Sequence, residues 1–233
     1  MARCLTEAEA RAIGGIGSAT ANLLCTYSRA QALGCKAASG VSLASNQIVY
    51  EGSIVTSHEY VDLGLPSGTK WAIYNIGASD YGYGNHFIWG DTTPVNVNTY
   101  TYVERTTTTY NDPATYYWGS SWKTPTEAQF VELDSNCTRS WRTGYNGYNG
   151  FLFTSKKNSR TIFFPAAGAV MARGSYRYQG QMCTYWSTTS SERSSYTSSS
   201  NKYARVLYGG TSEYYACSNF GKGYGCSVRA VLA

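Results

Sequence analysis

The sequence has few charged residues, and this shortage narrows the classes of partner. Asp, Glu, Lys and Arg make up 14% of the 233 residues, below the roughly 25% of an average soluble protein. The formal net charge of +5 is small and scattered. Its densest cluster, Lys156, Lys157 and Arg160, fits a solvated turn better than a phosphate-binding track. Nucleic acid is therefore not expected as a partner.

The sequence also lacks long apolar runs. No stretch of about eighteen consecutive apolar residues occurs. The first fifteen residues, MARCLTEAEARAIGG, contain no apolar centre of the kind that a secretion signal requires. We therefore expect neither a membrane span nor a secretion signal.

Residues that carry chemistry are scarce or scattered. The seven cysteines include no CxxC pair, and the two histidines, His58 and His86, lie far in sequence from any pair of cysteines. Zinc requires four clustered Cys or His ligands and calcium requires several oxygens together, so no metal and no cofactor is expected. No GxSxG-like motif accompanies a histidine, and catalysis is not expected. The thiols are predicted to be buried and reduced, although Cys217 and Cys226 are spaced to close a loop.

Residues 1–48 are rich in Ala and differ from the rest of the chain. Segments 6–14 and 26–34 have capping-box spacing and end in glycine, which predicts two short helices. Helices this short are marginal alone and must pack on a neighbour. We predict a small helical attachment segment, either a docking or assembly module or a hairpin that covers one end of the main domain. Residues 49–58 are predicted to be a linker.

From residue 59 to 233 the pattern changes to short β-prone runs separated by Gly, Asn, Ser and Pro. Such runs are typical of strands that end in turns. The predicted strands lie within 69–77, 85–91, 150–155, 160–168 and 203–210. The pattern predicts an α+β domain with mixed short strands, one clear helix and long irregular loops.

The one clear helix begins near residue 125. Thr124 is placed to cap it, Pro125 suits its first position, and Glu127 completes a capping box. Phe130 and Leu133 are expected to share its buried face.

The longest irregular connection spans residues 91–121. It has little helical or strand periodicity and contains five Tyr and one Trp. Loops of this length in compact domains are usually functional or ordered by their own packing. We predict a packed loop.

The segment 185–226 has the composition of a recognition surface. It contains ten Ser and seven Tyr, with two acidic and four basic residues. Antibody paratopes use the same mixture, because Tyr offers a large amphipathic contact at low entropy cost while Ser and Gly adapt around it. A Ser-rich surface loop of a β-protein is the alternative interpretation.

Separate motifs follow one another in order along residues 59–233. They are EYVDLGLPSGTKWA (59–72), NIGA (75–78), FIWG (87–90), WKTPT (122–126), FPAAG (164–168), YWS (185–187) and SVRAV (227–231). In this order they resemble the C-type-lectin-like domains, related to formylglycine-generating enzymes, that occur in Bacteroidetes and phage proteins.

The resemblance implies the variable protein of a diversity-generating retroelement. In that family a reverse transcriptase copies a template with errors at adenines, and the copy replaces the 3′ part of the gene, so that chosen positions change on a fixed scaffold. The variable region implied here spans about residues 185–226. The ligand-binding residues implied by it are Glu192, Arg193, Tyr196, Tyr203, Arg205, Leu207, Tyr214, Tyr215, Ser218, Asn219, Phe220 and Tyr224.

Two residue patterns bear on this interpretation. Strand alternation predicts Tyr203, Arg205 and Leu207 on one face of the strand. It predicts Ala204, Val206 and Tyr208 on the other face, which points toward the core. Diversified Asn codons that end in a pyrimidine cannot become Gln, Lys, Glu, Met or Trp. The nine implied positions from Tyr203 to Tyr224 obey this rule.

The partner implied is a protein or glycan on a target cell surface, and the location is a virion, at a tail tip or fibre, or a cell surface. The N-terminal segment would serve assembly there. A non-diversified phage-tail or cell-surface adhesin, in which the Tyr/Ser segment makes fixed subunit contacts, remains the alternative.

Overall fold

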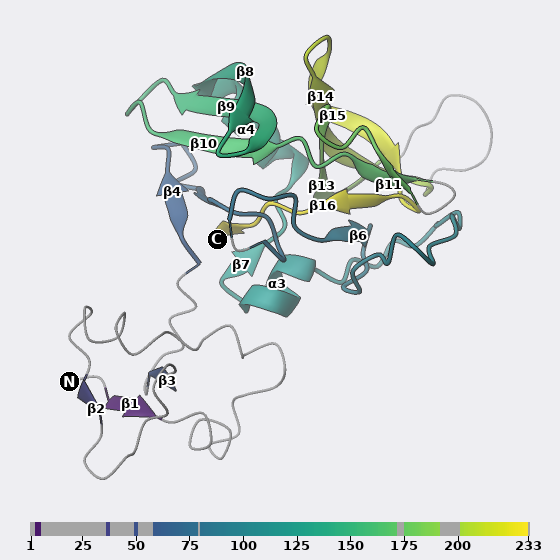
Figure 1. Cartoon of the computed structure of the whole chain (residues 1–233), viewed down its shortest axis with the longest axis horizontal. Coiled ribbons are helices and arrows are strands. Elements are labelled where there is room, and N and C mark those ends of the chain that lie inside the picture. The colour runs from purple at the N-terminus through teal and green to yellow at the C-terminus, as the bar shows by residue number, and fades with distance from the viewer. Residues whose placement is uncertain are drawn as a thin grey trace. The chain divides into compact units, whose positions relative to one another are not determined.

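Figure 1 shows the computed structural model of the chain, which divides into two compact units, Met1–Ser57 and His58–Ala233. The structure describes residues 58–78, 80–171, 175–191 and 201–232, together with the backbone of three short strands nearer the N-terminus.

The three described strands of the first unit form one small sheet. They are β1 (Arg3–Leu5), β2 (Lys36–Ala37) and β3 (Val49–Tyr50), in the order β2-β1-β3. β2 is parallel to β1 and β3 is antiparallel to it. β3 lies inside the segment predicted as a linker. The helices predicted over 6–14 and 26–34 fall outside the described residues.

The second unit is a mixed α+β structure, mostly strands, with two short helices in its described part. Its elements are β4 (Tyr60–Asp62), β5 (Lys70–Ala72), β6 (His86–Ile88), α3 (Pro113–Trp118), β7 (Trp122–Lys123), α4 (Glu127–Asn136), β8 (Cys137–Tyr145), β9 (Tyr148–Ser155), β10 (Thr161–Pro165), β11 (Ala169–Met171), β12 (Ser175–Arg177), β13 (Met182–Ser191), β14 (Tyr203–Gly210), β15 (Tyr214–Gly221), β16 (Gly225–Ser227) and β17 (Val231–Leu232). Each of the five predicted strand segments overlaps one of these strands, although β9 begins two residues before the segment 150–155, so the α+β class is confirmed.

The described strands of this unit form three sheets. Their orders are β4-β5-β17-β7, β10-β9-β8, and β12-β11-β16-β13-β14-β15 with β6 also paired to β16. β17, from the end of the chain, pairs with β5, with Val231 opposite Trp71. The last strand of the unit is therefore held between β5 and β7, and β13, β14 and β15 stand next to one another in the largest sheet (Figure 1).

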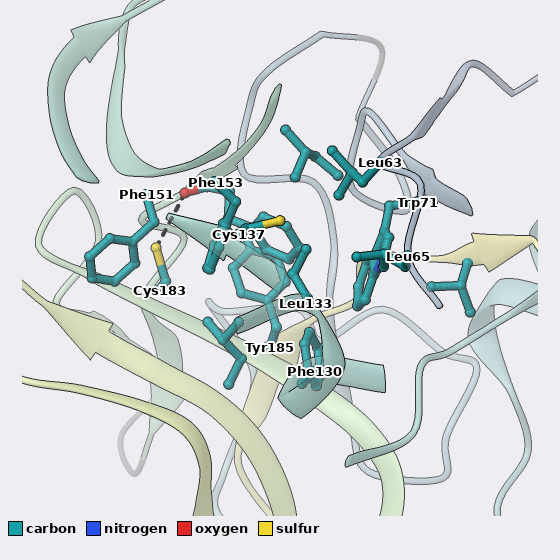
Figure 2. Packing of buried hydrophobic residues seen from close by; sticks show 14 of the residues in the cluster. Leu63, Leu65, Trp71, Phe130, Leu133, Cys137, Phe151, Phe153, Cys183 and Tyr185 are labelled. Atoms are coloured by element: carbon teal, nitrogen blue, oxygen red, sulfur yellow. Dashed lines mark hydrogen bonds between the residues drawn. The ribbon is translucent and has the colours of Figure 1, made fainter. Parts of the chain in front are cut away.

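Two hydrophobic clusters cover both faces of the central strands. The first, drawn in Figure 2, joins Trp71, α4 and the β9–β10 pair to β13, where Tyr185 is fully buried. Phe130 and Leu133 of α4 are both fully buried in this cluster, as predicted. The second cluster contains Trp186, the next residue of β13. Neighbouring residues of β13 thus point into opposite cores.

α4 begins two residues later than predicted. Its N-cap is Thr126, whose side chain accepts from the Gln129 N–H at 3.3 Å while the Gln129 side chain accepts from the Thr126 N–H at 2.9 Å. Thr124, the predicted cap, instead donates its hydroxyl to Asp112 at 2.6 Å. Because a distant carboxylate takes up this hydroxyl, the helix uses the next available threonine.

α3 lies inside the connection 91–121, which was predicted to be irregular throughout. Asp112 caps it by accepting from the Ala114 N–H at 2.9 Å, and Pro113 occupies its first turn. Asp followed by Pro is a helix-start signal, so Asp112 and Pro113 could have predicted the start of α3. Trp118 at its last position is buried in the second cluster.

His86 of β6 makes stability depend on pH. Its ring is buried, with Nε2 3.0 Å from the Ala167 carbonyl oxygen and Nδ1 without a hydrogen-bond partner in the described structure. Burial lowers its pKa from 6.5 to about 4. Between these values His86 binds a proton in the unfolded chain but not in the folded chain. His86 therefore does not reduce the free energy of unfolding above pH 6.5, and it reduces this free energy progressively as the pH drops to 4.

The variant His86→Phe is therefore expected to lose up to about 3 kcal/mol less of its free energy of unfolding on acidification than the parent, because one pKa unit corresponds to about 1.4 kcal/mol. Urea denaturation at pH 7 and pH 4.5 measures this loss. His58, half-buried and stacked 3.8 Å from Trp118, also has its pKa lowered to about 4, and His58→Phe is expected to remove a smaller part. An unchanged pH dependence in His86→Phe would show that another group is responsible.

Candidate ligand-binding surface

β13, β14 and β15 are consecutive antiparallel strands, and β14 and β15 carry most of the residues implied to bind ligand. A tight turn joins β14 to β15, and in it the Gly210 N–H donates to the Glu213 carbonyl at 2.8 Å. Ala204 and Val206 are fully buried in the second cluster, which confirms their predicted core positions. The β14 strand of the hairpin is therefore anchored in the second cluster.

Two of the implied residues are well exposed tyrosines on this hairpin. The exposed fractions of Tyr203 and Tyr215 are 37% and 51%. Both belong to regular strands, so their backbones are held by the ladder between β14 and β15. The remaining upstream positions, Glu192, Arg193 and Tyr196, lie outside the described residues.

Leu207 does not lie on the surface, contrary to the prediction from alternation. It is fully buried in the first cluster, and in the ladder it stands opposite Tyr185 of β13. Alternation correctly separated Leu207 from Val206, but each of them faces a hydrophobic core. Only the end of β14 near Tyr203 and Arg205 leaves that face open to solvent.

Tyr214 is largely a packing residue. Its ring lies 5.2 Å from the Phe151 ring and 3.3 Å below the Arg139 guanidinium group. Burial is the main cause that raises its pKa. Tyr214 therefore joins the hairpin to the β8–β9 pair and offers little of its ring to a ligand.

Arg205 and Asn219 belong to a polar network that reaches α4. The Arg205 Nε and Nη2 groups lie 3.0 and 2.8 Å from Oε1 of Glu127, and Nη1 donates to Asn219 Oδ1 at 3.0 Å. The Ser191 hydroxyl donates to the same oxygen at 2.5 Å. Glu127 was expected only as a capping residue, and no local sequence signal places it beside Arg205.

A row of aromatic rings lies beside the exposed tyrosines. Ring centroids are 6.2 Å apart for Tyr208 and Phe220, 5.1 Å for Phe220 and Tyr224, and 4.9 Å for Tyr224 and Tyr102. Phe220, Tyr224 and Ser218 are all half-buried. Tyr102 comes from the 91–121 connection, so this loop borders the surface.

That loop is held against the hairpin by Lys222. The side chain of Lys222 is fully buried, donates to the Thr107 carbonyl at 2.7 Å and lies 4.1 Å from the Trp89 ring. A salt bridge of 2.8 Å between Lys202 and Glu104 adds a second link. The packed loop that was predicted over 91–121 is confirmed at these contacts.

The described thiols in the candidate surface are packing groups and not reactive nucleophiles. Cys217 and Cys226 are free, so the suggested loop closure does not form. Cys226 is fully buried, and burial raises the pKa of Cys217 to about 12, which keeps this thiol protonated and poorly nucleophilic at neutral pH. Within the described ranges, no group of three or more His, Cys, Asp or Glu side chains is placed to hold a metal ion.

Comparison with known protein families, with curated proteins and with solved structures found no match to this chain. In the described part of the chain, no helix is long and apolar enough to cross a membrane.

Proposed function

We propose that this chain is a ligand-binding protein whose recognition surface is formed by β14, β15 and the adjoining part of β13. The observation that carries the proposal is the exposure of Tyr203 and Tyr215 on two paired strands, of which β14 is anchored by the fully buried Ala204 and Val206. Large aromatic groups on a rigid support bind at low entropy cost, and such residues dominate binding energy at interfaces.

In this proposal the domain is C-type-lectin-like, and its surface positions are diversified by adenine-directed retroelement copying. The ordered motifs from EYVDLGLPSGTKWA to SVRAV support it, as does a mixed α+β structure in which the candidate variable strands are anchored in two hydrophobic clusters. The ligand is a protein or glycan of a target cell surface. The protein acts on a virion or cell surface, to which the N-terminal unit attaches it.

Tyr215 and Tyr214 provide a matched test, because they are neighbours with different environments. A partner is first selected from a panel of purified cell-surface proteins and a glycan array. Tyr215→Ala is then expected to weaken binding about tenfold or more without lowering the melting temperature. Tyr214→Ala is expected to lower the melting temperature, because it removes the contacts with Phe151 and Arg139. Unchanged binding by Tyr215→Ala, measured by calorimetry, would count against this surface.

Gene context separates diversification from the fixed adhesin. A neighbouring reverse-transcriptase gene and a near-copy of the 3′ segment that differs at adenines are expected. Their absence, together with binding by Tyr215, would leave an adhesin with a constant site.

A further inference from the structure

β15 forms an edge of the largest sheet. Among the described strands it pairs only with β14. Every residue from 214 to 220 keeps part of its surface exposed, whereas most of β13 is buried. An edge strand presents unpaired N–H and C=O groups, which can pair with another chain.

The ladder shows which of these groups point outward. The Lys222 N–H donates to the Lys202 carbonyl at 2.9 Å, and in an antiparallel ladder bonded and non-bonded pairs alternate. Asn219 stands opposite Arg205 in the same uninterrupted register, at a non-bonded position. The backbone N–H and C=O of Asn219 therefore point away from β14.

β8 shows by contrast how this protein protects a long edge. It is also an edge strand, of the β10-β9-β8 sheet, and it carries the exposed Arg142, whereas its Arg139 stacks on Tyr214 of β15. Charged residues and prolines on an edge discourage pairing with other chains. β15 has the sequence YYACSNFG, with no charged residue and no proline. Its outer edge lacks the protection that β8 has.

We propose that the outer edge of β15 binds an extended segment of a protein ligand by strand addition. This inference rests on the proposed function and selects a protein over a glycan. The row of outward N–H and C=O groups matches the hydrogen-bonding groups of another extended backbone. The edge is also continuous with Tyr215, whose exposed ring stands on the same strand.

Strand addition suits a surface whose side chains change. Main-chain hydrogen bonds supply affinity, and the side chains that alternate along the added strand supply specificity. Replacing a side chain on β15 leaves the outward N–H and C=O groups in place unless the new residue is proline. The edge would thus be the constant part of the site and the tyrosines its adjustable part.

A random library of displayed peptides of about twelve residues is the probe, selected against the full chain, since extended peptides are the ligands that sheet edges take up. A selected peptide is then synthesised with one N-methyl group at each position in turn. Affinity is expected to fall about tenfold or more at every second position and to change little between them, because alternate N–H groups of an added strand face the edge. A flat profile, or no selected peptide, would overturn the inference.

Two variants of the chain test the hydrogen bond that the outward Asn219 N–H would donate to the peptide. Asn219→Pro removes the outward N–H at an edge position where proline is tolerated, and Asn219→Ala removes the same side chain but keeps the N–H. We expect Asn219→Pro to bind the peptide about tenfold more weakly than Asn219→Ala. Equal affinities of two folded variants would contradict strand addition. Circular dichroism checks folding, and if Asn219→Pro does not fold, the N-methyl profile on the parent chain decides.

The outcomes separate this inference from the proposed function. Loss of peptide binding in Tyr215→Ala with a flat N-methyl profile would leave the recognition surface standing and exclude the edge. Binding to glycans alone would do the same. A dimer that dissociates in Asn219→Pro but persists in Asn219→Ala would assign the edge to a second copy of the chain and overturn the inference.

Discussion

Replacing Arg229 with methionine is expected to lower the free energy of unfolding by about 3–5 kcal/mol, because it leaves several buried acceptors without a donor. Arg229 is fully buried. Its Nε donates to Asn75 Oδ1 at 2.8 Å, and Nη1 lies 3.1, 2.9 and 3.0 Å from the carbonyl oxygens of Ala72, Ile73 and Phe163. The side chain thereby joins the segment after β5 to β10 and to the end of the chain.

Burial lowers the pKa of Arg229 to about 10, so the guanidinium group is still charged at neutral pH. Its charge is compensated by carbonyl dipoles and by the Phe164 ring, 4.6 Å away. Methionine retains the apolar stem but donates no hydrogen bond.

Urea denaturation of Arg229→Met measures the loss, with Arg142→Met as the matched control. Arg142 is exposed on β8, and its replacement is expected to change stability by less than about 0.5 kcal/mol. Equal stabilities of the two variants would mean that the Arg229 bonds contribute little. A lower unfolding slope in Arg229→Met would indicate a change in the compactness of one of the two states.

Replacing Leu207 with aspartate is expected to prevent folding. Leu207 is fully buried, and losing a core leucine alone costs about 2–5 kcal/mol. The aspartate would also place a carboxylate in the first cluster, where ionisation is disfavoured and a partner is missing. Together these costs approach the 5–15 kcal/mol that stabilises a typical domain, so the variant is expected to be insoluble or unfolded.

Tyr215→Asp is the matched control on the same hairpin. Its side chain is 51% exposed, and the change is expected to leave the near-ultraviolet circular dichroism spectrum and the melting temperature close to those of the parent. A folded Leu207→Asp protein would show that the core tolerates diversification at this position. If instead only Tyr215→Asp folds, residue 207 is restricted to apolar side chains by its place in the first cluster.

The helix α4 and five of the strands of the second unit follow from local pattern. The alternation in β14 correctly places Ala204 and Val206 in a core, and the spacing of Phe130 and Leu133 correctly gives the buried face of α4. These features are readable because they depend on neighbours within a few residues.

Contacts between distant segments decided the side-chain environments that local pattern did not predict. Thr124 donates to Asp112 and so does not cap α4, and Arg205 pairs with Glu127 instead of standing free for a ligand. Strand alternation tells which residues share a face but not whether that face is covered. Leu207 is buried because α4 and the β9–β10 pair, both encoded far from β14, pack over it, whereas Tyr203 and Tyr215 stay exposed. The sequence by itself determined α4, five of the strands and the composition of the surface, and only the tertiary structure decided which residues of that surface are exposed.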